Sequence, residues 1–362
     1  MKILYDSQCF NMQKFGGVSR YFYKLAKYNG GRFDYKISGL FGDNIYLPEI
    51  SSIPPFPIKN NFKGKSRVIT KINNFFDGRA IKKSDYDLFH PTYYSVPTRP
   101  EKKPVVITVH DFIHEVFPQD FPASDNTASL KESAMQNASR IIAISQATKN
   151  DLLKFYPGVD ESKIDVVLHA IEWFPREKKS LQKPFAKPYV LYTGQRKGYK
   201  NFTAFAKACA PALVENDLFL VCTGSPFSAE EKALFESLGA GDRFFCVFAD
   251  DDLLRTLYEN ALFFAFPSLY EGFGLPVLES FVSGCPLLLS DASCFPEIAG
   301  DAALYFDPKS DGDLKEKVAR MIQSESLRKD LAEKGRKRFD DFTLDGMMAN
   351  TAAVYKKTLD NF

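Results

Sequence analysis

Short runs of apolar residues alternate along the chain with longer segments in which apolar positions follow a helical pattern. Segments 145–156 and 314–324 are examples of the helical kind. Ten of the short runs are predicted as strands: KILYD (2–6), PVVITVH (104–110), RIIAIS (140–145), KIDVVLH (163–169), PYVLYTG (188–194), LFLVCTG (218–224), RFFCVF (243–248), ALFFAF (261–266), CPLLLS (285–290) and AALYF (302–306). This alternation is typical of βαβ units, in which helices cover a parallel sheet.

The number of strands and the length of the chain predict two domains. Ten strands are too many for one open sheet in a domain of ordinary size, and 362 residues suit two domains. The polar stretch 174–188 contains three prolines and is predicted as a linker. We therefore expect doubly wound α/β domains at 1–175 and 176–342. Their ligands should bind outside the carboxyl ends of the strands, in the cleft between the domains. The closing helix, 343–362, begins after Thr343 as N-cap and could pack back on the first domain.

Composition and charge narrow the class of protein. The chain is 45% hydrophobic and 25% charged, as soluble globular proteins are. Its net charge of +2 gives no reason to expect nucleic acid as a partner. We expect no signal peptide, because the first ten residues carry Asp6 and no long apolar core. The six cysteines form no CxxC pair and suit buried thiols in a reducing cytoplasm.

Two glutamates bracket a glycine-containing loop in the stretch YEGFGLPVLE. Glu271 precedes the loop Gly272–Leu275, and Glu279 lies about one turn into the helix that Pro276 is expected to begin. The amides of such a loop, at a helix N-terminus, bind anions and above all phosphates. Glu279 would suit the vicinal hydroxyls of a ribose, and Glu271 a sugar hydroxyl. The alternative is that Glu279 only complements the helix dipole and Glu271 is solvated.

This stretch and several others together resemble family 4 glycosyltransferases with the GT-B fold. EGFGLPVLE resembles the family's motif of two glutamates separated by seven residues. FGGVSRY (15–21), VHD (109–111), AISQATKNDL (143–152), YVLYTGQRKGYKNF (189–202) and the closing helix occur in the family's order. The resemblance covers nearly the whole chain. It implies two Rossmann-like domains that face a central cleft, the first for the acceptor and the second for a nucleotide-sugar donor.

The resemblance also implies roles for individual residues. Glu271 would contact the donor sugar, and Glu279 would bind the ribose hydroxyls. The loop between them would contact the sugar and the diphosphate through Gly272, Phe273, Gly274 and Leu275. Phe248 would lie near the base, and His110 near the anomeric centre. Gly16 and Gly17 belong to a loop that, in the family, touches the donor phosphate and borders the acceptor site.

Cations follow the strand YVLY in the loop TGQRKGYKN. A cation here would stabilise the charge that a diphosphate gains as its bond to the sugar breaks. Lys200 matches the family's lysine before asparagine. Many members carry an arginine directly after the glycine, where this chain has Gln195, so Arg196 is displaced by one position. Lys197 could compete with Arg196, or it could be a solvated surface charge.

Two further features leave alternatives open. His110, Asp111 and His114 could in principle hold a metal, but no other ligand cluster accompanies them. No convincing DxD is present, so we expect neither a metal nor another cofactor. Segment 59–83 carries eight positive residues against Asp77 alone, with apolar residues interspersed. It suits either a solvated helix or contact with an anionic membrane surface.

The sequence therefore predicts a retaining glycosyltransferase with His110, Glu271, Lys200 and Arg196 as catalytic residues. The donor would be GDP-mannose or a UDP-hexose, and the acceptor a glycan or a lipid-linked saccharide. Bacterial surface polysaccharide or glycolipid assembly is the expected setting. We expect the protein in the cytoplasm, with peripheral contact to the inner membrane. The rival functions are a GT-B epimerase or hydrolase of nucleotide sugars, and a non-catalytic sugar-nucleotide-binding partner of another transferase.

Overall fold

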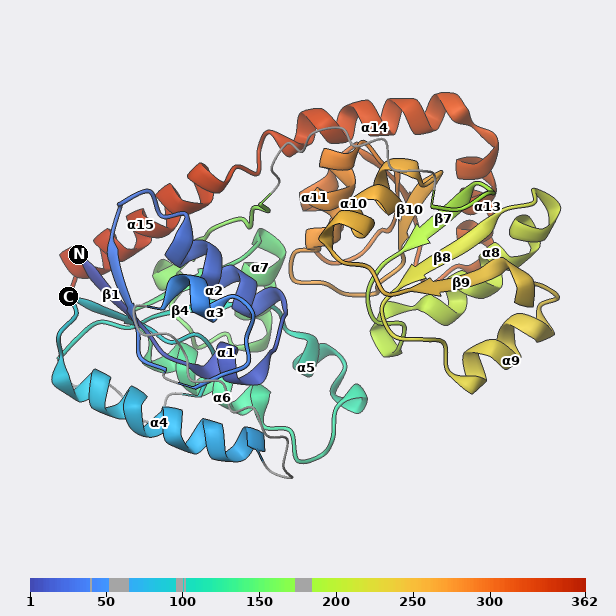
Figure 1. The fold of residues 1–362 in the computed structure, drawn as a ribbon. Coiled ribbons are helices and arrows are strands. Elements are labelled where there is room, and N and C mark those ends of the chain that lie inside the picture. The colour runs from blue at the N-terminus through green and yellow to red at the C-terminus, as the bar shows by residue number, and fades with distance from the viewer. Residues whose placement is uncertain (40, 52–64, 96–99, 101, 173–183) are drawn as a thin grey trace. The chain divides into compact units, whose positions relative to one another are not determined.

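The computed structural model describes residues 1–362 except 40, 52–64, 96–99, 101 and 173–183. The chain divides into two compact units, Met1–His169 with Leu344–Phe362, and Ala170–Thr343. In each unit, parallel strands are covered by helices (Figure 1). The fold is therefore mixed α/β with two Rossmann-like domains, as the sequence predicts. The expected linker, 174–188, lies largely outside the described residues.

The first unit contains β1 to β6 and the helices that connect them. Its strands pair in the orders β2-β1-β3 and β4-β5-β6, and a parallel bridge between Phe89 and Val105 joins β3 to the segment before β4. The strands are β1 (Lys2–Tyr5), β2 (Asp34–Ile37), β3 (Leu88–His90), β4 (Val106–Val109), β5 (Arg140–Ala143) and β6 (Ile164–Val166). The helices are α1 (Gln8–Met12), α2 (Gly17–Lys27), α3 (Leu47–Ile50), α4 (Lys65–Lys83), α5 (Ile113–Val116), α6 (Thr127–Asn137), α7 (Gln146–Phe155) and α15 (Leu344–Asp360), with short 3-10 turns η1 (Pro118–Asp120) and η2 (Glu161–Lys163).

Helix α15 returns the end of the chain to the first unit. The fully buried Tyr355 hydroxyl lies 3.1 Å from the Tyr5 hydroxyl and 2.7 Å from Nδ1 of His90. Lys357 forms an ion pair with Asp165, on β6, at 2.8 Å. These contacts join the last helix to strands β1, β3 and β6.

The described residues of the second unit form a six-stranded parallel sheet in the order β12-β11-β10-β7-β8-β9. The strands are β7 (Tyr189–Tyr192), β8 (Phe219–Thr223), β9 (Phe244–Val247), β10 (Phe263–Phe266), β11 (Leu287–Ser290) and β12 (Ala303–Phe306). The helices are α8 (Phe202–Glu215), α9 (Ala229–Ser237), α10 (Asp251–Asn260), α11 (Leu275–Ser283), α12 (Phe295–Ala299), α13 (Asp311–Gln323) and α14 (Glu325–Phe339), with 3-10 turns η3 (Gly198–Lys200) and η4 (Gly241–Arg243). All ten strands predicted from apolar runs are confirmed.

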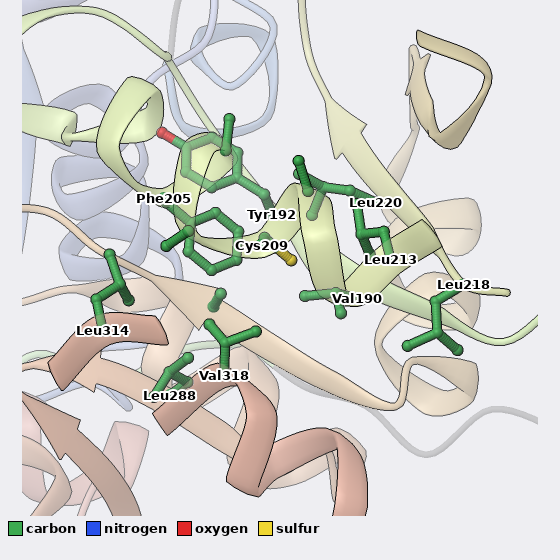
Figure 2. Close-up of a cluster of buried hydrophobic side chains, with 14 of the residues drawn as sticks. Val190, Tyr192, Phe205, Cys209, Leu213, Leu218, Leu220, Leu288, Leu314 and Val318 are labelled. Carbon is green, nitrogen blue, oxygen red and sulfur yellow. The ribbon is translucent and has the colours of Figure 1, made fainter. Parts of the chain in front are cut away.

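Helices α8 and α13 pack together against one face of this sheet. Phe205, Cys209 and Leu213 recur every fourth residue along α8, and all three are fully buried. Leu314 and Val318 face them from α13, and Val190, Leu220 and Leu288 complete the cluster from the strands (Figure 2). A fully buried leucine or phenylalanine contributes roughly 1.5–3 kcal/mol. This packing fixes β7 and β8, and with them the loops at their carboxyl ends.

Candidate active site

The strand order of the second unit indicates where a ligand would bind. From β7 the chain proceeds outward to β8 and β9, and then returns to β10 on the other side of β7 before continuing to β11 and β12. The direction reverses between β7 and β10, which pair in parallel. Ligands of such sheets bind at this reversal, outside the carboxyl ends of the strands. The loops that follow β7 and β10 are the ones that carry the predicted phosphate and sugar contacts.

A partly buried ion pair joins these two loops. Nζ of Lys200, after β7, lies 2.5 Å from Oε1 of Glu271, after β10, and the two side chains are only 16% and 13% exposed. The Leu269 amide also donates to the Tyr199 carbonyl at 2.7 Å. Burial lowers the pKa of Lys200, but the carboxylate of Glu271 outweighs burial and the net pKa is raised. The structure thus brings together two predicted site residues that are far apart in sequence, and Lys200 carries its charge at neutral pH.

The glycine loop leads directly into helix α11. Gly274 precedes the helix with φ +81°, and a Cβ there would lie 2.9 Å from the ring of Phe295, so glycine is required. The ring of Phe273 is buried against Phe342, with centroids 5.9 Å apart. Phe273 can therefore offer a ligand only its backbone. Leu275 begins the helix. Pro276 has no N–H, and the Val277 amide donates to the Gly274 carbonyl at 2.9 Å, so the Leu275 amide is the first-turn donor that remains for a ligand.

Glu279 lies on α11, and its carboxylate is held by a tyrosine from α10. The hydroxyl of the buried Tyr258 donates to Oε2 of Glu279 at 3.2 Å and lies 3.4 Å from Oγ1 of Thr193. Burial, with the negative charge of Glu279, raises the pKa of Tyr258 well above its usual value. Tyr258 is not among the site residues that the sequence predicts. Nothing in the local sequence distinguishes it from the other tyrosines.

The structure places Arg196 away from the Lys200–Glu271 pair, against the loop after β8. Its Nε lies 2.6 Å from Oε1 of Glu231, and its side chain is only 7% exposed. Lys197, in contrast, is exposed. That Arg196 contacts a diphosphate stays a prediction. In this structure the guanidinium is engaged by protein groups.

The carboxyl end of β9 carries the predicted base contact. Phe248 directly follows this strand and is 82% exposed. Asp250 then caps α10 by accepting a hydrogen bond from the Leu253 amide at 2.8 Å. Phe248 therefore presents an exposed aromatic ring at the carboxyl end of β9.

In the first unit, His110 follows β4 with a neutral ring. The ring lies edge-on to Tyr21, at 5.3 Å, and is stacked with His169, at 6.0 Å. Burial lowers the pKa of His110 to about 4, so the imidazole is uncharged at neutral pH. The Tyr94 hydroxyl accepts a hydrogen bond from the His110 amide at 3.2 Å. Nε2 of His110 is buried and has no hydrogen-bond partner among the described residues. It therefore retains the capacity to hydrogen-bond a ligand.

The paired glycines begin helix α2. A Cβ on Gly16 would meet the Gln13 side chain at 2.5 Å, whereas one on Gly17 would meet nothing within 4 Å. Oε1 of Gln13 accepts a hydrogen bond from the Ser19 amide at 3.1 Å. One first-turn amide of α2 is thus satisfied by a side chain, and a ligand at this helix start would have to displace it.

The aspartates of DYD (85–87) are engaged with Lys2. Asp85 forms an ion pair with Nζ of Lys2 at 2.9 Å, and Asp87 accepts from the Lys2 amide at 2.8 Å. Within the part of the chain that the structure describes, no three His, Cys, Asp or Glu side chains are grouped so that they could hold a metal ion.

Comparison with known proteins identifies the class. Residues 15–172 match the family described as Glycosyltransferase Family 4, and residues 174–338 match Glycosyl transferases group 1. The chain is 25% identical over 288 residues to the O-antigen chain mannosyltransferase B of Escherichia coli, covering 75% of this chain and 74% of the relative.

Solved structures share the fold over the full length. Sucrose-phosphate synthase from Thermosynechococcus elongatus superposes with a TM-score of 0.77 at 17% identity, covering 100% of both chains. Anabaena Alr3699/HepE, in complex with UDP and glucose, superposes with a TM-score of 0.75 at 18% identity, covering 98% of this chain and 99% of that one.

Together, the fold, the family matches and the similar solved structures define this protein as a glycosyltransferase with the GT-B fold. The chain belongs to glycosyltransferase family 4.

Proposed function

We propose that this glycosyltransferase moves a hexose, with mannose favoured, from a nucleoside-diphosphate donor to a glycan or lipid-linked acceptor with retention of configuration. The observation that carries the proposal is the partly buried Lys200–Glu271 pair, which lies beside the start of α11 at the reversal of the second sheet. It puts a lysine that is charged at neutral pH beside Glu271, the carboxylate that we propose binds the donor sugar. The name of the Escherichia coli mannosyltransferase supports mannose and surface polysaccharide assembly, and the UDP complex of the Anabaena protein keeps a UDP-hexose open.

The donor would extend along the carboxyl edge of the second sheet. Its ribose would bind Glu279, and its diphosphate would meet Lys200 and the amides at the start of α11. Glu271 would accept a hydrogen bond from a hydroxyl of the donor sugar. That His110, in the first unit, contacts a donor-sugar hydroxyl stays a prediction. Its neutral ring, with a buried Nε2 that has no hydrogen-bond partner among the described residues, suits such a bond.

The chemistry then depends on leaving-group stabilisation. The bond between the sugar's anomeric carbon and the β-phosphate oxygen breaks, and that oxygen gains charge opposite Lys200. The acceptor oxygen forms the new bond on the same face of the sugar. Its proton passes to the departing phosphate oxygen, so the nucleoside diphosphate leaves with the bonding electron pair and the proton.

Turnover with labelled donors tests the proposal. The protein is incubated with GDP-mannose, UDP-glucose or UDP-galactose, with and without a lipid-linked saccharide. Transfer of label to the acceptor supports the proposal. Release or isomerisation of the sugar that needs no acceptor supports the epimerase or hydrolase instead. Binding of donor with neither reaction supports the non-catalytic partner.

Turnover is expected to persist in excess EDTA. Lys200 and the N-terminus of α11 already supply positive charge to the diphosphate, so a divalent cation is not needed for charge balance. The measurement is the initial rate of transfer with and without EDTA, with the untreated enzyme as control. Complete loss that manganese restores would contradict this expectation.

Helix α4 supports the proposed membrane contact. Its buried side holds Ile69, Asn73, Asp77 and Ile81. Its exposed side carries Arg67, Lys71, Phe75, Arg79 and Lys82. Phe75 is 60% exposed, and the Arg79 guanidinium lies 5.8 Å from its ring centroid. An exposed aromatic among cations suits an anionic lipid surface. The start of the basic segment, 59–64, lies outside the described residues, and no helix in the described ranges is long and apolar enough to span a membrane.

Replacing Lys71 and Arg79 by glutamine is expected to weaken binding to anionic vesicles by roughly 30-fold, since each surface cation contributes about 1 kcal/mol. Sedimentation with vesicles of phosphatidylglycerol and phosphatidylcholine measures this. Lys207→Gln and Lys232→Gln, on the second unit, serve as the charge-matched control. Equal binding to neutral and anionic vesicles, or equal binding by both double variants, would exclude α4 as the contact.

A further inference from the structure

Arg196 makes more side-chain contacts than a solvated loop cation would. Nε and Nη2 lie 2.6 Å and 3.2 Å from the two carboxylate oxygens of Glu231. Nη2 also donates to the carbonyls of Ser225 and Pro226, at 2.8 Å and 3.1 Å. The guanidinium lies over the ring of Phe227, 4.8 Å from its centroid. A bidentate, stacked arginine of this kind fixes geometry, and lysine cannot reproduce it.

Glu231 connects this arginine to the start of helix α9. It is the third residue of the helix, and its Oε2 accepts from the Ser228 amide at 2.7 Å while its own amide donates to the Ser228 hydroxyl at 3.2 Å. This is a complete capping box. Burial raises the pKa of Glu231, but Arg196 and the Ser228 amide outweigh it and the net pKa is lowered. One carboxylate therefore caps the helix and holds Arg196.

The same contacts reach a third strand. The thiol of Cys246, on β9, lies 3.0 Å from the Ser225 carbonyl, and Nη1 of Arg196 lies 3.8 Å from that sulfur. Arg196 itself follows β7, and Ser225 to Glu231 follow β8. The guanidinium thus joins the carboxyl ends of three neighbouring strands. Four residues after Arg196, the same loop presents Lys200.

We propose that Arg196 is a positioning residue and not a phosphate ligand. It holds segment 225–231 against the loop 193–201 that follows β7, which we call the phosphate loop, so that both loops keep the spacing that the nucleoside end of the donor needs. This inference rests on the proposed function, because it is the donor that would lie along these strands from Lys200 to Phe248. It differs from the sequence prediction, in which the positive charge of Arg196 itself meets the diphosphate.

The two roles predict different kinetics. A cation aimed at the leaving phosphate acts on the transition state, so its loss lowers kcat. A residue that shapes the nucleoside site acts on binding, so its loss raises KM for the donor and weakens binding of the free nucleoside diphosphate. In addition, only the positioning role predicts that replacing Glu231 has the same effect on nucleotide binding as replacing Arg196, because the two side chains act as one unit.

The experiment compares Arg196→Ala, Glu231→Gln, their double variant and Arg196→Lys. Glutamine also serves in a capping box, so Glu231→Gln removes the ionic partner but keeps the helix cap. Lys197→Ala and Glu236→Gln are matched controls, because both residues are exposed. Hydrogen–deuterium exchange of the amides at 225–231 is measured on the free protein. Calorimetry with GDP and with UDP, and steady-state kinetics with the preferred donor, follow on the same samples.

We expect faster exchange at 225–231 in both single variants, in the double variant and in Arg196→Lys, but not in the controls. Nucleoside-diphosphate affinity and KM should each change by about tenfold, the loss of a charged hydrogen-bonding pair, with kcat within about threefold and no added loss in the double variant. A kcat loss of roughly 10²-fold in Arg196→Ala alone, with Glu231→Gln normal, would overturn the inference in favour of a phosphate contact.

Two further outcomes separate this inference from the proposed function. Unchanged exchange in Arg196→Ala, or faster exchange with unaltered nucleotide affinity, would overturn the positioning role while transfer by the wild type stands. A wild-type protein that binds neither GDP nor UDP would refute the proposed function and, with it, the role at the donor. The exchange data would then still show whether Arg196 holds the segment.

Discussion

Replacing Lys200 by alanine is expected to slow sugar transfer by roughly 10²–10³-fold, the scale of losing one preorganised electrostatic contact. The diphosphate gains charge as the glycosidic bond breaks, so a cation aimed at it lowers the barrier more than it tightens ground-state binding. The raised pKa of Lys200 keeps it protonated through neutral and mildly alkaline pH, so this contribution should not titrate in that range. Single-turnover transfer at saturating donor measures the effect directly.

The partner of Lys200 makes a second variant necessary. In Lys200→Ala the carboxylate of Glu271, which is 13% exposed, loses its cation and would repel the diphosphate. Lys200→Met combined with Glu271→Gln removes both charges. Comparison of this double variant with Glu271→Gln alone shows how much of the loss comes from that repulsion. Lys197→Ala, which removes an exposed neighbouring cation, should stay within about tenfold of wild type.

If Lys197→Ala loses transfer activity and Lys200→Ala keeps nearly the wild-type rate, the phosphate-binding lysine of this loop is assigned to the wrong position. The family's residue roles would then not apply to this loop, although the assignment of the fold and of the family would stand. Nucleoside-diphosphate affinity, measured by calorimetry on the same proteins, separates a binding defect from a chemical one.

The strands were predictable because parallel strands are buried on both faces. Helices cover both faces of such sheets, so each strand appears in the sequence as a continuous run of apolar residues. Strand β2 was missed because it reads DYKI, with charges at Asp34 and Lys36. It is the edge strand of its sheet and is partly exposed, so it can carry charged side chains.

The site was predictable residue by residue but not as an arrangement. Lys200 and Glu271 are 71 positions apart, and only the pairing of β7 with β10 brings them within 2.5 Å. Arg196 shows the opposite case, because a local motif suggests a phosphate contact, whereas its partner Glu231 lies 35 residues away on another loop. Such contacts depend on strand order, which a local pattern does not contain.

Substitutions of Glu279, on α11, and of Glu271, before it, are expected to have different effects. Glu279→Ala should weaken binding of the nucleoside diphosphate by on the order of 1.5–3 kcal/mol, the value of a hydrogen bond to a charged group, because it would lose the ribose hydroxyls. Tyr258→Phe should show a smaller loss of the same kind, since its hydroxyl holds the Glu279 carboxylate at 3.2 Å. Neither change touches the group that faces the reacting sugar.

Glu271→Gln should instead lower turnover on the order of 10²-fold, because it alters a contact to the reacting sugar. Its effect on nucleoside-diphosphate affinity should be small or favourable, since Lys200 is released from its ion pair and becomes available to the diphosphate. Calorimetry with the diphosphate alone and single-turnover transfer at saturating donor separate the two glutamates. Glu215→Ala, at the exposed end of α8, is the control. If Glu271→Gln and Glu279→Ala lose diphosphate affinity equally, the assignment of one glutamate to the sugar and the other to the ribose is wrong.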